Sequence, residues 1–120
     1  MPLKVLIIED EKSVYELLVL FLEKKGCSVV GAGTAVSGIM LAQKEKPAVI
    51  LIDAHLPDSE GLDVLRRIRS FDKEAKVFLY SGLYNQDLEE EAVSAGASGF
   101  IDKASSIESI INVIVSAIGQ

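Results

Sequence analysis

Short apolar runs alternate with amphipathic segments along this chain, and that alternation constrains the fold more than any other feature. Five runs are almost continuously apolar and short enough for buried strands: 3–8, 29–30, 48–52, 77–80 and 99–101. The segments between them, and the one after the last, repeat apolar residues at helical spacing. This order predicts an α/β fold, a doubly wound parallel sheet with helices on both faces.

Several residues mark where these helices begin and end. Thr34 and Asn85 are good N-caps for the second and fourth helices, and Gly26 and Gly119 can end the first and the last. The first helix is expected to direct five apolar side chains into the core: Val14, Leu17, Leu18, Phe21 and Leu22. The third should do the same with Leu62, Leu65 and Ile68.

The composition fits one domain over residues 1–120. The chain is 49% hydrophobic, enough for a single core, and Cys27 is its one cysteine, so an internal disulfide is excluded. No apolar run approaches the roughly 18 residues of a membrane span, and the N-terminus lacks a signal-type segment. We therefore expect a cytoplasmic protein without a membrane contact. The net charge of −6 disfavours direct binding of nucleic acid.

Polar side chains follow four of the predicted strands. Ligands of such folds bind outside the carboxyl ends of the strands, so these side chains should converge at one edge of the sheet. Loops are commonly polar, and one such residue alone would indicate little. Their coincidence at four strand ends favours a site built from Glu9, Asp10 and Glu11, then Asp53, then Ser81, then Asp102 and Lys103.

The residue types of this edge suit phosphoryl chemistry. Crowded carboxylates repel one another unless a cation neutralises them, and Mg²⁺ prefers such hard oxygen ligands. A carboxylate that is free of an ion pair can then act as a nucleophile towards phosphorus. Lys103 and the metal would neutralise the phosphoryl oxygens, and Ser81 could donate a hydrogen bond to one of them.

Together these segments resemble the receiver domains of response regulators in two-component signalling, over essentially the whole chain. The similar segments are 5–11, Asp53 with 56–57 and Gly61, 81–82, and 96–97 leading to Phe100 and Lys103. The resemblance implies a flavodoxin-like (βα)5 sheet with the strand order 2-1-3-4-5. It also implies a sensor histidine kinase or phosphotransfer protein as partner. The resemblance does not imply a conventional turnover enzyme. It implies that the domain phosphorylates itself from a phosphodonor in the presence of Mg²⁺ and later dephosphorylates itself.

The resemblance also assigns roles to residues. Asp10, Asp53 and the backbone carbonyl of His55 would bind Mg²⁺ or Mn²⁺ directly, and Glu9 would act through water. Asp53 would accept the phosphoryl group and Lys103 would pair with it. The switch pair would be Ser81 and Phe100.

His55 is the only histidine of the chain. It lacks the helical dimerisation segment of a transmitter, so we do not expect it to be a phosphodonor. Together with Leu83, which lies two residues after Ser81, its side chain is expected to tune dephosphorylation by contacting the attacking water. An idle, exposed imidazole is the alternative.

One position departs from the family pattern. Many receivers have a cis-proline after the lysine, whereas this chain has Ala104, which disfavours a cis bond there. The loop that carries Lys103 is therefore expected to differ in shape.

Three other functions fit the sequence less well. The segments 53–55 and 81–83 also resemble cobalamin-binding domains, but that motif requires a glycine where Asp58 stands and gives Lys103 no role. Aspartyl-phosphate hydrolases carry a second aspartate where this chain has His55, and they need a larger fold. A flavodoxin would need a phosphate-binding loop rich in Ser, Thr or Gly after the first strand.

The last helix has more apolar residues than one core face requires. Its core stripe is expected to contain Ile107, Ile110, Ile111, Ile114 and Ile118. Val113, Val115 and Ala117 should widen this surface. Such a surface favours homodimer formation on phosphorylation, while deep packing or contact with an output domain absent from this chain are the alternatives.

Overall fold

Five parallel strands form one sheet, four helices connect them, and a fifth helix follows the last strand. The computed structural model describes residues 3–83 and 85–118. The strands are β1 (Lys4–Ile8), β2 (Ser28–Ala32), β3 (Val49–Asp53), β4 (Lys76–Ser81) and β5 (Gly99–Asp102). The helices are α1 (Lys12–Lys24), α2 (Ala35–Glu45), α3 (Gly61–Arg69), α4 (Gln86–Ser94) and α5 (Ile107–Ile118).

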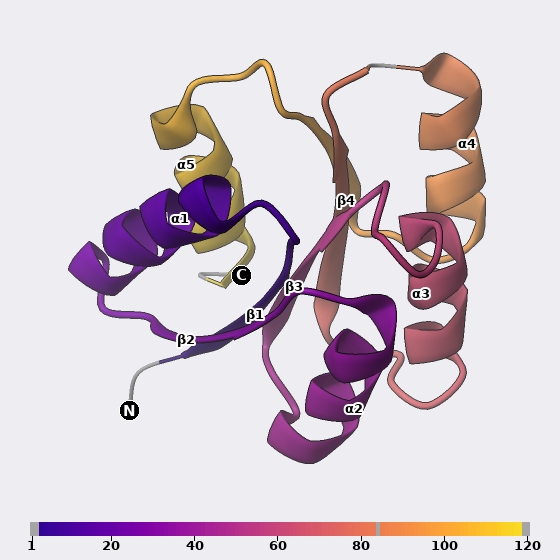
Figure 1. Cartoon of the computed structure of the whole chain (residues 1–120), viewed down its shortest axis with the longest axis horizontal. Helices are drawn as coiled ribbons and strands as arrows, with labels where there is room; N and C mark the ends of the chain where they lie inside the picture. The colour runs from indigo at the N-terminus through magenta and orange to yellow at the C-terminus, as the bar shows by residue number, and fades with distance from the viewer. Residues whose placement is uncertain (1–2, 84, 119–120) are drawn as a thin grey trace.

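The strand order β2-β1-β3-β4-β5 confirms the predicted doubly wound topology. Every strand pair is parallel. Helices α1 and α5 cover one face of the sheet, and α2, α3 and α4 cover the other (Figure 1). The strand order reverses between β1 and β3, so the carboxyl ends of these two strands frame the position where such sheets bind ligands.

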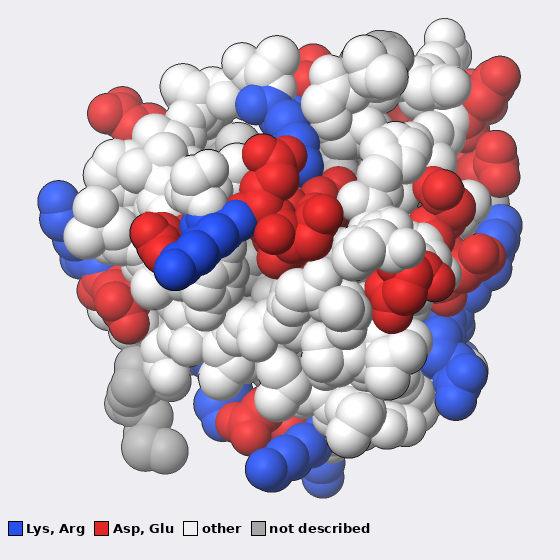
Figure 2. Space-filling model, in the orientation of Figure 1, with Lys and Arg blue, Asp and Glu red and all other residues white. Residues whose placement is uncertain are grey.

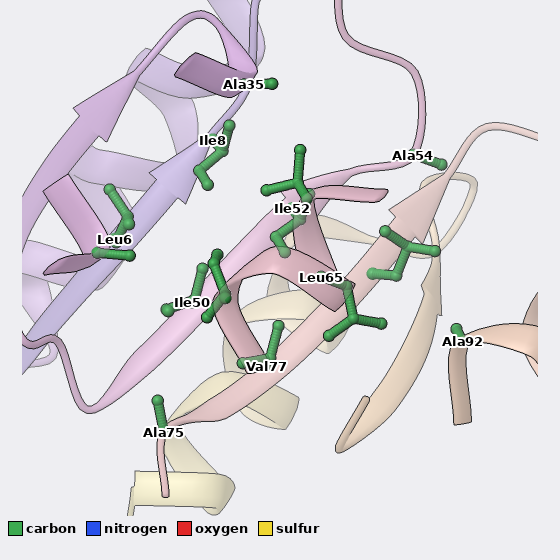
Figure 3. Close-up of a cluster of buried hydrophobic side chains, with 14 residues drawn as sticks. Leu6, Ile8, Ala35, Ile50, Ile52, Ala54, Leu65, Ala75, Val77 and Ala92 are labelled. Carbon is green, nitrogen blue, oxygen red and sulfur yellow. The ribbon is translucent and has the colours of Figure 1, made fainter. Parts of the chain in front are cut away.

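Alternate strand residues build two cores, one on each face. Leu6 and Ile52 point towards the side of the sheet that α2, α3 and α4 cover, and they belong to one buried cluster with Leu65 (Figure 3). On the other face, Val5 lies in a cluster with Leu18 of α1 and with residues of α5. Because neighbouring residues of a strand face opposite sides, a sheet that is covered twice needs strands without polar positions. This explains the continuous apolar runs of the sequence.

The predicted helix ends are confirmed where the structure describes them. The Thr34 side chain accepts the Ser37 N–H, and the Asn85 side chain accepts two N–H groups of α4. Gly26 follows α1 with a φ of 86°, a left-handed conformation that glycine adopts without strain. Gly119 lies outside the described residues.

Two expectations about helix faces are wrong. Leu17 was expected in the core but is 44% exposed, because α1 centres its buried face on Leu18 and Leu22. In α5, Val115 and Ala117 are half-buried against the core, so only Val113, 41% exposed, adds apolar surface there. The side chain of Ile118 lies outside the described residues.

Within the described residues, no helix has both the length and the apolar composition needed to cross a bilayer.

Candidate functional site

Asp53 and Glu9 occupy neighbouring strand ends at the reversal of the sheet. Asp53 is the last residue of β3, Glu9 directly follows β1, and both are 3% exposed. Helix α3 begins very close to Asp53, since the Gly61 N–H donates to the Ala54 carbonyl at 2.8 Å. A Cβ atom on Gly61 would lie 2.3 Å from the Asp53 backbone oxygen. The glycine at the start of α3 therefore permits the close approach that encloses Asp53.

Three carboxylates meet at this edge, as the sequence predicted. One oxygen of each of Glu9, Asp10 and Asp53 lies within 4.8 Å of the others, and Asp10 is the exposed member. Figure 2 shows one face of the molecule, with acidic side chains gathered near its middle and basic side chains beside them. Backbone donors fix two of the three: His55 N donates to Asp53 Oδ1 at 3.0 Å, and Glu11 N to Glu9 Oε2 at 3.1 Å. This set of hard oxygen donors fits a divalent cation.

Lys103 supplies the positive charge of the site. It directly follows β5, and its Nζ lies 3.0 Å from Asp53 Oδ2 and 3.3 Å from Glu9 Oε1. Burial alone would lower the pKa of Lys103, but the hydrogen bond and charge of Asp53, followed by Glu9, raise it above its ordinary value. Asp53 is therefore held in an ion pair, contrary to the expectation of a free carboxylate.

Tyr80 belongs to the site, although the sequence assigned it only to the core of β4. Its hydroxyl donates to Glu9 Oε1, and its ring centroid lies 4.7 Å from Lys103 Nζ. Burial, and then the hydrogen bond and charge of Glu9, raise the pKa of Tyr80. The sequence contains only a weak signal for this role of Tyr80. A buried tyrosine hydroxyl needs a hydrogen-bond partner, but the sequence does not identify that partner.

The remaining predicted residues are Ser81, Leu83, Phe100 and His55. Ser81 ends β4 and is buried, and its hydroxyl is within hydrogen-bonding distance, 3.2 Å, of both the N–H and the carbonyl of Leu83. The Leu83 side chain is 78% exposed. Phe100 is half-buried and packs against the core beneath α3 and α4. His55 is exposed, with Nδ1 3.1 Å from Glu60 Oε2.

The loop after Lys103 contains no cis peptide, in agreement with Ala104 at the position after the lysine. It is held instead by Asp102, whose side-chain Oδ1 accepts the Ala104 N–H at 2.8 Å and whose carbonyl accepts the Ser105 N–H at 3.0 Å. The Lys103 N–H donates to the Ser81 carbonyl at 2.8 Å. The ends of β4 and β5 are thus joined directly beside the site.

The sequence matches one protein family over most of its length. The family model of the response regulator receiver domain covers residues 5–115. The probable transcriptional regulatory protein TcrX of Mycobacterium tuberculosis is 31% identical over 110 residues, which are 92% of this chain and 47% of TcrX. This chain spans about half the length of the curated relatives that it matches.

Solved structures share the fold closely. A CheY-like response regulator receiver domain protein from Methanospirillum hungatei JF-1 superposes with a TM-score of 0.94 at 24% identity, over 99% of this chain and 95% of that one. A chain of the CheX-CheY-BeF3-Mg²⁺ complex from Borrelia burgdorferi superposes with a TM-score of 0.92 at 22% identity, over 98% and 90% of the two chains. At these identities the similarity shows the fold.

Proposed function

This chain belongs to the response regulator receiver domain family of two-component signalling, and from that premise we propose that Asp53 is its phosphoacceptor. The observation that carries the proposal is the surroundings of the Asp53 carboxylate. It is buried at a strand end, grouped with two further carboxylates, and bonded to the Lys103 ammonium. Receiver domains of this family take the phosphoryl group from histidine kinases or phosphotransfer proteins, and we assign this chain a donor of that kind.

The proposed transfer is one nucleophilic displacement. A carboxylate oxygen of Asp53 attacks the phosphorus of a phosphohistidine, the O–P bond forms as the N–P bond breaks, and the released imidazole nitrogen takes a proton from solvent. The product is an acyl phosphate. Water later hydrolyses it, which restores the carboxylate and releases inorganic phosphate. In this proposal Lys103 neutralises the phosphoryl oxygens, so positioning and charge stabilisation are the main contributions of the protein.

The metal of the proposal is Mg²⁺, and Mn²⁺ would find the same oxygen donors. Asp10, Asp53 and the backbone carbonyl of His55 would hold it, with Glu9 acting through water. When bound, the ion would offset carboxylate repulsion and neutralise phosphoryl charge. The fit rests on the convergence of the three carboxylates within 4.8 Å. The Borrelia burgdorferi complex, which includes Mg²⁺ together with BeF3 and a chain of the same fold, supports this choice.

Intact-mass measurement tests the acceptor. After incubation with Mg²⁺ and acetyl phosphate, the wild-type chain should gain one phosphoryl group and Asp53→Asn should gain none. Asp63→Asn is the matched control, because Asp63 is an exposed aspartate in the first turn of α3, outside the carboxylate cluster of Glu9, Asp10 and Asp53. It should be phosphorylated like the wild type. A phosphoryl group on Asp53→Asn would refute the assignment.

Thermal unfolding tests the metal. Since a ligand that binds only the folded state stabilises it, Mg²⁺ should raise the melting temperature of the wild type near pH 7. Asp10→Asn should reduce that rise, whereas Asp63→Asn, an exposed acid in the first turn of α3, should preserve it. A melting temperature that stays constant up to roughly tens of millimolar Mg²⁺ would exclude the site.

The switch part of the proposal concerns the α4, β5 and α5 surface. The phosphoryl group draws the Ser81 hydroxyl towards it, and Phe100 turns into the space that Ser81 leaves. His55 and Leu83 flank the path of the attacking water and set the lifetime of the phosphorylated state. The changed surface then supports homodimer formation or contact with an output domain.

A further inference from the structure

The ring and the hydroxyl of Tyr80 contact two different charged neighbours of Asp53. The residue is 1% exposed and packs in the core beneath α1 and α5. Its hydroxyl donates to Glu9 Oε1, and its ring faces Lys103 Nζ at 4.7 Å from the centroid. A residue that served packing alone would not need the polar atom, since burying a hydroxyl is costly unless it is hydrogen-bonded.

Glu9 and Asp53 compete for the same ammonium. Lys103 Nζ is 3.3 Å from Glu9 Oε1 and 3.0 Å from Asp53 Oδ2. The Glu9 side chain is fully buried, so this carboxylate has to satisfy its oxygens with protein donors. The Tyr80 hydroxyl supplies one donor to Oε1, and the Glu11 N–H supplies one to Oε2. Without the hydroxyl, Lys103 would be the remaining donor that the structure places on Oε1.

We infer that Tyr80 is a positioning residue for phosphorylation of Asp53, because it keeps the Lys103 ammonium available to the phosphoryl group. The hydroxyl acts through Glu9, whose demand for the ammonium it reduces. The ring acts on Lys103 directly through a cation–π contact that limits where the ammonium can move. This inference rests on the proposed function of Asp53 and adds a residue to it.

Removing the hydroxyl alone tests the inference. Tyr80→Phe keeps the ring, so it should slow phosphorylation by acetyl phosphate at saturating Mg²⁺ about tenfold, the order expected when a hydrogen bond to a charged group is lost. Tyr80→Leu removes the ring as well and should be slower still. Phe78→Leu is the matched packing control, since Phe78 lies on the same strand in the same core without a polar atom. It should lower the melting temperature and leave the rate per folded molecule unchanged.

A double-mutant cycle tests the route through Glu9. If Tyr80 acts through this carboxylate, Tyr80→Phe should have little further effect in a Glu9→Gln background. The side-chain ammonium signal of Lys103 in a ¹⁵N NMR spectrum gives a readout that does not depend on phosphorylation. It should shift in Tyr80→Phe and stay in place in Phe78→Leu.

The outcomes separate the two proposals. A wild-type chain that acquires no phosphoryl group would refute the proposed function of Asp53, and the role of Tyr80 with it. A wild type that is phosphorylated, together with a Tyr80→Phe variant of equal rate and unshifted Lys103 signal, would refute the inference alone. Fully additive effects of Tyr80→Phe and Glu9→Gln would refute the route through Glu9.

Discussion

Asp58 connects the loop that follows Asp53 to the N-terminus of α2. Its Oδ1 accepts the Ala35 N–H at 2.7 Å and its Oδ2 accepts the Val36 N–H at 3.2 Å. The first N–H groups of a helix have no partners within it and favour negative charge nearby. The hydrogen bond from Ala35 is the main cause of the lowered pKa of Asp58. The exposed carboxylate of Asp58 thus links the loop between β3 and α3 to the start of α2.

This contact predicts a pH dependence of stability. An aspartate with a folded-state pKa below its unfolded value of about 3.9 stabilises the fold fully above that value, and the contribution is lost as the pH falls through the folded-state pKa. Asp58→Asn should therefore lower the free energy of unfolding at pH 7 and make it less sensitive to acid. Urea unfolding at pH 7 and pH 3 measures both effects. Glu74→Gln, at an exposed carboxylate outside the helices, is the control; a wild-type acid dependence in Asp58→Asn would contradict the assignment.

At the scale of single residues, the sequence predicts the site only as far as strand ends determine it. Glu9, Asp53 and Lys103 directly follow or end parallel strands, and such ends meet at one edge whatever the loops do. The contact of Tyr80 with Glu9 joins residues 71 apart in the chain, and that of Asp58 with Ala35 joins residues 23 apart. These depend on strand register and loop path, which periodicity does not encode.

Helix α3 is the element whose start most directly shapes the site. The Gly61 position has space for a hydrogen but not for a methyl group, since a Cβ would lie 2.3 Å from the Asp53 carbonyl oxygen and 2.9 Å from Ala54 Cα. Both are backbone atoms and cannot rotate away. The close packing of α3 on the end of β3 therefore requires glycine at this position.

Gly61→Ala should destabilise the fold by about 1–3 kcal/mol, the usual cost of forcing extra volume into a packed region. It should also slow phosphorylation, because the strain falls on the backbone of Asp53. Urea unfolding and the acetyl phosphate assay measure the two effects. Gly33→Ala is the matched control, since a Cβ there would meet no atom within 4 Å. Equal stability of the two variants would mean that α3 can move away from β3 without cost.

At the scale of elements, periodicity predicts that each strand and helix exists but fixes their edges and faces less well. β2 spans Ser28–Ala32, whereas only residues 29–30 were predicted, because its half-buried positions lack a continuous apolar run. Leu17 satisfies the apolar spacing of α1 yet lies at the border of its buried face and is 44% exposed. Spacing identifies a stripe of residues, and only packing determines where the stripe is centred.

On the scale of the molecule, the site and the α4, β5 and α5 surface are joined through paired strands. Ser81 pairs with Asp102 across β4 and β5, and the Lys103 N–H donates to the Ser81 carbonyl at 2.8 Å. Displacement of Ser81 would therefore be transmitted to β5, which carries Phe100. Val93 of α4 and Val113 of α5 have side chains that are 56% and 41% exposed. Exposed apolar residues of this kind favour an interface when the surrounding surface changes.

Beryllium fluoride with Mg²⁺, a mimic of the phosphoryl group, should therefore shift the chain towards a dimer and change the amide signals of Phe100 and α5. Light scattering measures the mass, and amide NMR measures the shifts. Val113→Lys should abolish the dimer, because it places a charge in the interface, while leaving the Phe100 shift intact. Met40→Lys, on the 64% exposed Met40 of α2, should leave both unchanged. Shifts without a change in mass would reject the interface and keep the switch, whereas shifts confined to the residues around Asp53 would reject the coupling itself.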